Sequence, residues 1–187
     1  MIIIGITGTL GAGKGTIVDY LVQNKDFVHY SVREYLTKEI IIRGLSLNRD
    51  NMVLVANELR AKHNPSYIVE QLYQTALQNH KNCVIESIRT PGEAEMLKSK
   101  GDFYLIAVDA DAILRYKRIL MRASETDHVS FETFIANEQR EMTSKDTNKQ
   151  NLKKCIEMAD HVLVNNGSIE DLYTKLISVL LKIDKHG

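Results

Sequence analysis

The chain is poor in the residues that mark linkers and metal clusters. Its 187 residues include only two prolines and two cysteines. So little proline excludes a proline-rich linker, and the isolated cysteines, Cys83 and Cys155, fit no metal-ligand spacing. Cys83 lies within an apolar run, so we expect a buried, reduced thiol at that position.

Net charge and long apolar runs are also absent. The 24 lysines and arginines balance 24 aspartates and glutamates, which gives no sign of affinity for nucleic acid or for a membrane surface. No segment reaches the ~18 apolar residues of a membrane span, and the N-terminus lacks the basic and long apolar regions of a secretion signal. We therefore expect a cytoplasmic protein, a monomer or small homo-oligomer, with no nucleic-acid or membrane partner.

The composition that remains is that of an ordinary globular protein, with 44% hydrophobic and 26% charged residues. The apolar residues form five short continuous runs, at residues 2–7, 27–31, 83–87, 103–108 and 161–164. Continuous runs predict parallel strands that are buried on both faces, and helical patterns fill the intervals between them. We therefore predict an α/β fold in one domain of residues 1–187, with a doubly wound five-stranded parallel sheet.

Local signals predict the boundaries and faces of several helices. Residues 90–93, T-P-G-E, combine a capping threonine, a proline at the first helical position and a glutamate three residues later. The polar stretch 145–150 is expected to form an exposed turn between two helices. The last helix is expected to turn one apolar stripe toward the core. That stripe consists of Ile169, Leu172, Leu176, Ile177 and Leu180.

Residues 8–16, G-T-L-G-A-G-K-G-T, are the most informative stretch of the chain. They follow an apolar run and lead into a helical pattern, which is the strand, glycine-rich turn and helix that a phosphate-binding loop requires. Glycines let successive backbone N–H groups converge on a phosphate, and Lys14 adds a full positive charge. The simpler alternative is a glycine-rich turn with a surface lysine. We predict ATP contacts at Gly11, Ala12, Gly13, Lys14, Gly15 and Thr16.

The loop departs from the common pattern at Gly15. The hydroxyl that follows the lysine in that pattern ligates magnesium, and here a hydroxyl arrives one place later, at Thr16. We expect Mg²⁺ to be held mainly by phosphate oxygens, water and carboxylates elsewhere. Glu86, at the end of the predicted strand 83–87, is expected to order a magnesium-bound water, or else to pair with Lys14 or Arg89.

Arginines follow two of the predicted strands. Arg89 lies between a strand end and the capped helix, where its guanidinium can hold a phosphate through two hydrogen bonds. The alternative is a salt bridge from Arg89 to Glu86 or Glu93. Arg115, Arg118 and Arg122 share one helical face, from which they either lean over the triphosphate or are simply solvated.

The loop string G-A-G-K-G-T resembles those of adenylate, UMP/CMP and cytidylate kinases. Residues 86–95 similarly resemble the D-G-F-P-R-T motif of adenylate kinases, although S-I replaces G-F-P, and 118–122 resemble their R-I-x-x-R. The resemblance implies that Glu86 helps to place magnesium, that Arg89 grips the acceptor's phosphate, and that Arg118 and Arg122 begin a short lid at about 118–145.

The same resemblance covers the rest of the chain less closely. Ser31 and Glu34 stand where adenylate kinases carry S-T-G-D, within or beside an acceptor-binding helical segment at 33–80. Arg60 is the best single candidate for a second acceptor-phosphate contact, the alternative being a polar residue on a helix surface. Arg140 is a candidate for a returning lid arginine. Residues 159–168 resemble the A-D-x-V-I-x-N-x-G-S segment of dephospho-CoA kinases. That likeness implies donor-base contacts at Asn165 and Asn166, which otherwise form a turn.

These features together predict a P-loop nucleoside monophosphate kinase, with core segments 1–31, 82–110 and 159–187. Lys14, Arg89, Arg118 and Arg122 would act on the phosphoryl group that passes from Mg²⁺-bound ATP to a nucleotide. One alternative is dephospho-CoA kinase, against which Gly15 and the absence of an aspartate just after Gly8 both count. Another is an ATP-binding assembly or regulatory factor with little turnover.

Overall fold

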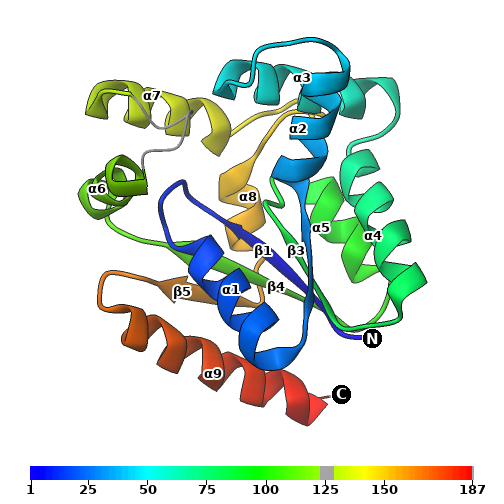
Figure 1. The fold of residues 1–187 in the computed structure, drawn as a ribbon, viewed down its shortest axis with the longest axis vertical. Helices are drawn as coiled ribbons and strands as arrows, with labels where there is room; N and C mark the ends of the chain where they lie inside the picture. The colour runs from blue at the N-terminus through cyan, green and yellow to red at the C-terminus, as the bar shows by residue number, and fades with distance from the viewer. Residues whose placement is uncertain (123–128, 187) are drawn as a thin grey trace.

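The computed structural model describes residues 1–122 and 129–186. Within these residues, five strands form one parallel sheet in the order β2-β3-β1-β4-β5 (Figure 1). Their bounds are β1 Ile3–Gly8, β2 Val28–Ser31, β3 Cys83–Glu86, β4 Phe103–Asp109 and β5 His161–Val164. The predicted strands are therefore confirmed to within one or two residues at each end. The predicted fold class, an α/β protein with a five-stranded parallel sheet and flanking helices, is confirmed as well.

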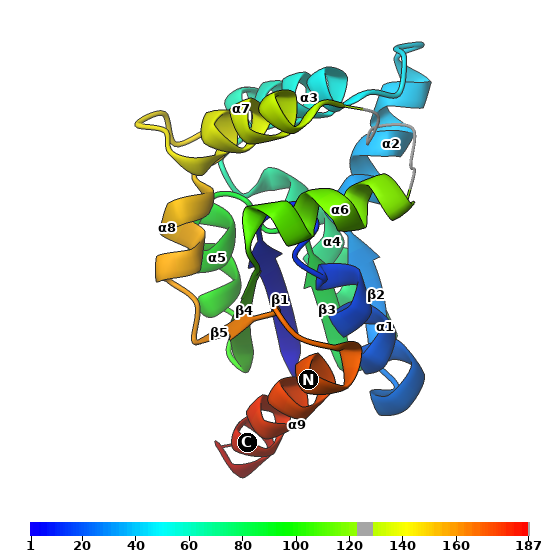
Figure 2. The ribbon, with the colours of Figure 1, turned by 90° about the vertical axis from the view of Figure 1, so that its left-hand side faces the viewer.

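The helices lie on both faces of the sheet and over its upper edge (Figure 2). In the described residues they are α1 Lys14–Lys25, α2 Val32–Ile42, α3 Arg49–Lys62, α4 Tyr67–Asn79, α5 Pro91–Lys98, α6 Ala112–Arg122, α7 Phe131–Met142, α8 Leu152–Glu157 and α9 Ile169–His186. The predicted capping box is present at Thr90 and Glu93. No helix in the described part of the chain is long and apolar enough to cross a membrane.

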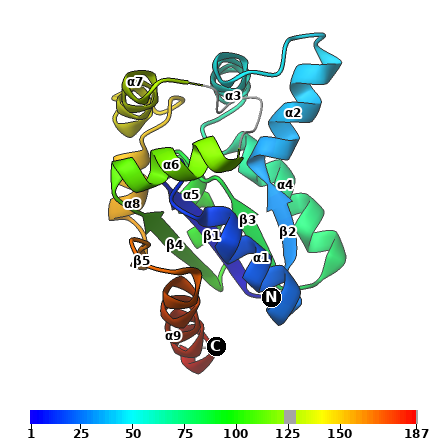
Figure 3. The same ribbon diagram turned by 60° about the vertical axis from the view of Figure 1, so that its left-hand side comes forward.

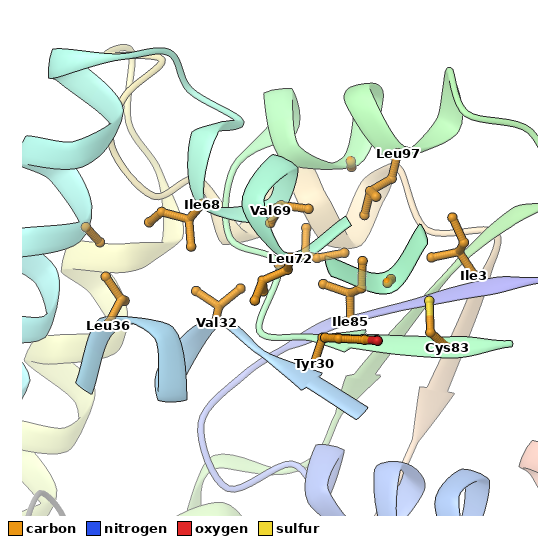
Figure 4. Close-up of a cluster of buried hydrophobic side chains, with 14 of the residues drawn as sticks. Ile3, Tyr30, Val32, Leu36, Ile68, Val69, Leu72, Cys83, Ile85 and Leu97 are labelled. Carbon is orange, nitrogen blue, oxygen red and sulfur yellow. The ribbon is translucent and has the colours of Figure 1, made fainter. Parts of the chain in front are cut away.

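Alternation along the strands divides the core between the two faces of the sheet. Ile4 packs with residues of α1 and α9 on one face. Ile3, one residue away, packs with Ile85 and Leu97 on the other face, together with residues of α2, α3, α4 and α5 (Figure 4). Because both faces are covered, both sets of side chains are apolar, and this explains the continuous apolar runs in the sequence. Cys83 is fully buried, as expected.

The last helix turns a different stripe toward the core than the sequence predicts. Leu172, Leu176 and Leu180 are buried, but Ile169 and Ile177 are 56% and 39% exposed. The inner face is completed instead by residues farther along the helix, Val179 and Ile183. The buried positions recur at spacings of three and four and so share one face, whereas Ile177 follows Leu176 by one position and lies about 100° away around the helix. Ile169 is the first residue of α9.

Four helices gather at the carboxyl edge of the sheet, where the strands β1, β3 and β4 end (Figure 3). These are α2, α3, α6 and α7, whereas α9 lies against β5 and α1. Ligands of open parallel sheets collect at this edge. The fold therefore places the end of β1, where the glycine-rich loop begins, close to these four helices (Figure 3).

Candidate active site

The glycine-rich loop has a backbone that only glycine fits at three of its positions. Gly8, Gly11 and Gly13 have φ angles of 130°, 78° and 103°, in the left-handed region that residues with a side chain avoid. A Cβ at Gly8 would overlap the carbonyl oxygen of Val108, one at Gly11 the carbonyl oxygen of Arg115, and one at Gly13 the Asn165 amide. Gly13 is also the N-cap of α1, so the loop ends at the N-terminus of a helix.

Lys14 is buried and folded back on its own loop. Its ammonium donates to the carbonyl oxygens of Gly8 at 3.0 Å and of Thr9 at 2.7 Å. Burial, together with the nearby charge of Arg89, lowers the pKa of Lys14 to about 7. A phosphate anion next to this ammonium would supply a negative charge that compensates for its burial.

A cavity of about 890 Å³ extends from the loop toward α2, α3 and α7. Eleven of the residues predicted from the sequence line it: Gly11, Gly13, Lys14, Gly15, Thr16, Arg60, Glu86, Arg89, Arg118, Arg122 and Asn165. Apolar side chains form much of the remaining wall, among them Val32, Leu36, Met52, Ala56, Ile119 and Ile169. The structure therefore gathers most of the predicted site around one space.

Four predicted residues lie outside this cavity. The Ala12 side chain is buried beneath the loop, where its carbonyl accepts a hydrogen bond from the Asn165 amide at 2.8 Å. The Asn166 amide instead exchanges hydrogen bonds with Asp111. Ser31, the N-cap of α2, and Glu34 line a second, shallower cavity of about 510 Å³.

Glu86 lines both cavities. Its carboxylate lies 3.3 Å from Nε2 of His29, without the alignment of a full hydrogen bond. Burial raises the pKa of the Glu86 carboxyl, but contact with His29 and the charges of Lys14 and Arg89 outweigh burial, so the pKa falls below its usual value. Glu86 is therefore an ionised carboxylate at neutral pH. No group of three or more acidic, histidine or cysteine side chains in the described residues is arranged to hold a metal.

The three arginines of α6 have different environments. Nη2 of Arg118 donates to the carbonyl of Asn165 at 3.0 Å, while Nη1 is buried without a hydrogen-bond partner in the described residues. Arg115 instead pairs with Glu138 of α7 and donates to the carbonyls of Ala110 and Leu10. Neither alternative for this helical face holds for Arg115, which does not line the cavity and is only 4% exposed. It holds α6, α7 and the loop together.

Arg49 and Glu141, which the sequence analysis did not select, also line the cavity. The Glu141 carboxylate lies 2.6 Å from Nη1 of Arg89 and 2.6 Å from Nη2 of Arg49. The predicted turn at 145–150 is also not fully exposed, because Gln150 lines the cavity and lies 3.5 Å from Arg89. The neighbour of Glu141, Arg140, points outward to Asp50 and does not line the cavity.

Arg60 has a structural partner that the sequence analysis did not anticipate. Its Nε and Nη2 donate to Glu93 at 3.1 and 2.7 Å, and both side chains are almost fully buried. Glu93 also accepts hydrogen bonds from the backbone N–H groups of Arg89 and Thr90. Nη1 of Arg60 is buried with no hydrogen-bond partner in the described residues, so the pair leaves one donor for a ligand.

Comparison with known proteins agrees with this architecture. Residues 4–144 match the family of AAA domains. A gluconokinase from Sinorhizobium meliloti superposes with a TM-score of 0.61 at 11% identity, covering 99% of this chain and 94% of that one. Shikimate kinase from Aquifex aeolicus superposes with a TM-score of 0.52 at 16% identity, covering 99% and 98%. At such low identity these likenesses concern the fold.

The glycine-rich loop, the AAA-domain match and the parallel sheet define a P-loop protein with a kinase-like fold, which confirms the expected resemblance at the level of the P-loop kinase fold. Within that class the chain belongs to the UPF0200 family. It is 32% identical over 186 residues to a UPF0200 protein of Methanococcus vannielii, covering 98% of this chain and 97% of that protein. It is also 27% identical to a UPF0200 protein of Methanocaldococcus jannaschii.

Proposed function

We propose that the protein is a nucleoside monophosphate kinase that transfers the γ-phosphoryl group of ATP to a nucleoside or deoxynucleoside monophosphate. The observation that carries the proposal is the pair formed by Arg49 and Arg89, which both line the cavity and share the Glu141 carboxylate. Two guanidiniums on one cavity wall match the charge and the oxygen geometry of a phosphate. An acceptor that already carries a phosphate would dock there, opposite the donor phosphates.

The environment of Glu86 favours a phosphate acceptor over a hydroxyl acceptor. A kinase that phosphorylates a hydroxyl group needs a base to take its proton, whereas an ionised phosphate attacks without one. The lowered pKa of Glu86 makes it a weak proton acceptor. A kinase that phosphorylates a hydroxyl could use an aspartate just after Gly8 as that base, but this chain has Thr9 there. The alternative of a dephospho-CoA kinase therefore fits less well.

The residues around the loop can each be given a role in the transfer. Backbone N–H groups at the start of α1 and the ammonium of Lys14 would bind the donor phosphates. The unpartnered Nη1 of Arg118, with Arg122 on the same face, would stabilise charge on the transferring group. Stabilisation of charge and alignment of two bound reactants supply most of the catalysis in this class of reaction.

The site fits a magnesium ion that takes most of its ligands from phosphate and water. Gly15 offers no hydroxyl, and Glu86 is an ionised carboxylate that lines the same cavity as the loop. Mg²⁺ usually keeps several waters and needs only one or two protein carboxylates. Glu86 would therefore order a magnesium-bound water, and Thr16 is the second candidate. When bound, the ion would neutralise the donor phosphates.

The decisive experiment is a substrate panel. The protein is incubated with ATP and Mg²⁺ and with each common ribonucleoside or deoxyribonucleoside monophosphate, and the nucleotides are separated by ion-exchange chromatography. We expect a diphosphate product from at least one acceptor. Dephospho-CoA, shikimate and gluconate serve as hydroxyl acceptors in parallel. If only a hydroxyl acceptor is phosphorylated, or none of the compounds is, the proposal fails.

A further inference from the structure

The acceptor end of the cavity already holds a negative charge that belongs to the protein. Glu141, in the last turn of α7, contacts both Arg49 and Arg89 at 2.6 Å. Its side chain is only 5% exposed, and those of the arginines are 19% and 16% exposed. One carboxylate is thus shared by the two guanidiniums that would bind the acceptor's phosphate.

We propose that Glu141 is an internal substitute for the acceptor's phosphate, so that acceptor binding displaces it and releases α7 from α3. This inference rests on the proposed function, because it assigns the acceptor's phosphate to the same two arginines. Each carboxylate oxygen now accepts from one guanidinium. A phosphate offers the same contacts with one more oxygen and a larger charge, so it competes effectively for the pair.

The arginines show that the carboxylate is an incomplete partner. Nε of Arg49 is buried with no hydrogen-bond partner in the described residues. A buried donor without a partner costs stability, commonly about 1–3 kcal/mol. A phosphate oxygen can accept this hydrogen bond, whereas neither oxygen of Glu141 accepts one from this Nε. Replacement of the Glu141 carboxylate by a phosphate would therefore give Nε of Arg49 the hydrogen-bond partner that it does not have in this structure.

The contacts of α7 determine what its release would do. Its other ion pair with α3, Arg140 to Asp50 at 3.1 Å, is exposed, and exposed pairs contribute little. On its opposite side α7 is held to α6 by the Arg115–Glu138 pair and by Phe134, whose ring lies 5.6 Å from that of Tyr116. Without Glu141 in place, α7 would leave α3 but stay with α6, the helix that carries Arg118 and Arg122. Acceptor binding would thereby be coupled to the arginines of the donor side.

Phosphate binding to Glu141→Gln tests the substitution. The glycine-rich loop is first saturated with Mg²⁺ and the β,γ-imido analogue of ATP, so that it does not bind the probe. Inorganic phosphate is then titrated, and its affinity is measured from the thermal shift. We expect E141Q to bind phosphate about tenfold more tightly than the unmodified protein, and E141D to lie between them. Asp50→Asn, which breaks the exposed pair between the same helices, is the control and should leave the affinity unchanged. Equal or weaker binding by E141Q would overturn the inference.

A distance measurement tests the movement of α7 even if E141Q does not fold. Spin labels are placed at A61C on α3 and Q139C on α7, both exposed positions. Cys83 and Cys155 are buried, and their thiol pKa values are raised by burial to about 11 and 12, so the labels will choose the new sites. Phosphate should lengthen the α3–α7 distance, and an unchanged distance would overturn the inference.

These measurements do not depend on turnover, so the two proposals can fail separately. A phosphate-dependent change in distance with no diphosphate product would keep the role of Glu141 and reject the kinase. Diphosphate formation with no change in distance would keep the kinase and reject the displacement of Glu141.

Discussion

The two ends of the cavity are built in different ways. The donor end takes its shape from one short stretch, residues 8–16, in which the glycines and the lysine lie within a few residues of one another. The acceptor end is assembled from separate helices and links, so that Arg49 and Glu141, which are 92 positions apart, form one ion pair. A local motif specifies the first end, and tertiary packing specifies the second.

The largest expected effect comes from removing the charge of Lys14 at the donor end. Lys14→Met should reduce phosphoryl transfer about a thousandfold, because it removes the buried charge that stabilises the transferring group. Turnover is measured with ATP and the accepted monophosphate. Lys117→Met, an exposed lysine on α6, is the matched control and should retain full activity. Comparable losses in the two variants would contradict the role of Lys14.

The acceptor end should respond to Arg49→Lys through acceptor binding. A lysine keeps the charge but loses the forked geometry, so the KM for the monophosphate should rise about tenfold to a hundredfold while the affinity for ATP stays constant. Both constants come from initial-rate kinetics. Arg43→Lys, at a residue that pairs with Glu39 and Glu58 outside the cavity, is the control. If Arg49→Lys changed the affinity for ATP and not the KM for the monophosphate, the assignment of Arg49 to acceptor binding would be wrong.

The pH dependence of ATP affinity tests the charge of Lys14 at the donor end. Because the pKa of Lys14 is about 7 in the free protein, ATP binding above pH 7 must add a proton to the neutral amine of Lys14. The affinity for ATP should therefore fall about fivefold between pH 7 and pH 8 and approach a tenfold loss for each further pH unit, with proton uptake seen by calorimetry in buffers of different ionisation enthalpy. In Lys14→Arg, whose guanidinium stays protonated, this pH dependence should disappear. A dependence that persists in the arginine variant would have another source.

The smallest expected effect concerns magnesium. A Cβ at Gly15 would have no atom within 4 Å, so Gly15→Ser should fit and restore a hydroxyl directly after the lysine. The Mg²⁺ concentration that gives half-maximal activity should fall roughly fivefold, the effect of about 1 kcal/mol from one polar contact. Gly15→Ala separates the hydroxyl from the added methyl group and should leave the requirement unchanged. An equal effect of both variants would exclude a metal contact.

The sequence predicted the donor end more fully than the acceptor end for a physical reason. Strands and loop are encoded by residues that are adjacent in the chain, so the sheet and most of the loop contacts follow from periodicity and spacing. Arg49 looks like any surface arginine of a polar helix until α7 brings Glu141 against it. The sequence did select Arg140, a residue in the same turn of α7, but the side chain that lines the cavity is that of its neighbour, Glu141.

Three glycines of the loop bear on how inactive relatives could be recognised. Gly8 is required by the backbone of β4, Gly11 by the backbone of Arg115 and Gly13 by the amide of Asn165, all of which belong to the protein and not to a nucleotide. A relative without the proposed ATP binding would still need these glycines in order to fold. Lys14, whose burial as a cation has a cost without a phosphate, is the position that such a relative would be free to exchange. Decay of the active site should therefore begin at the lysine, while the glycine pattern outlasts the activity.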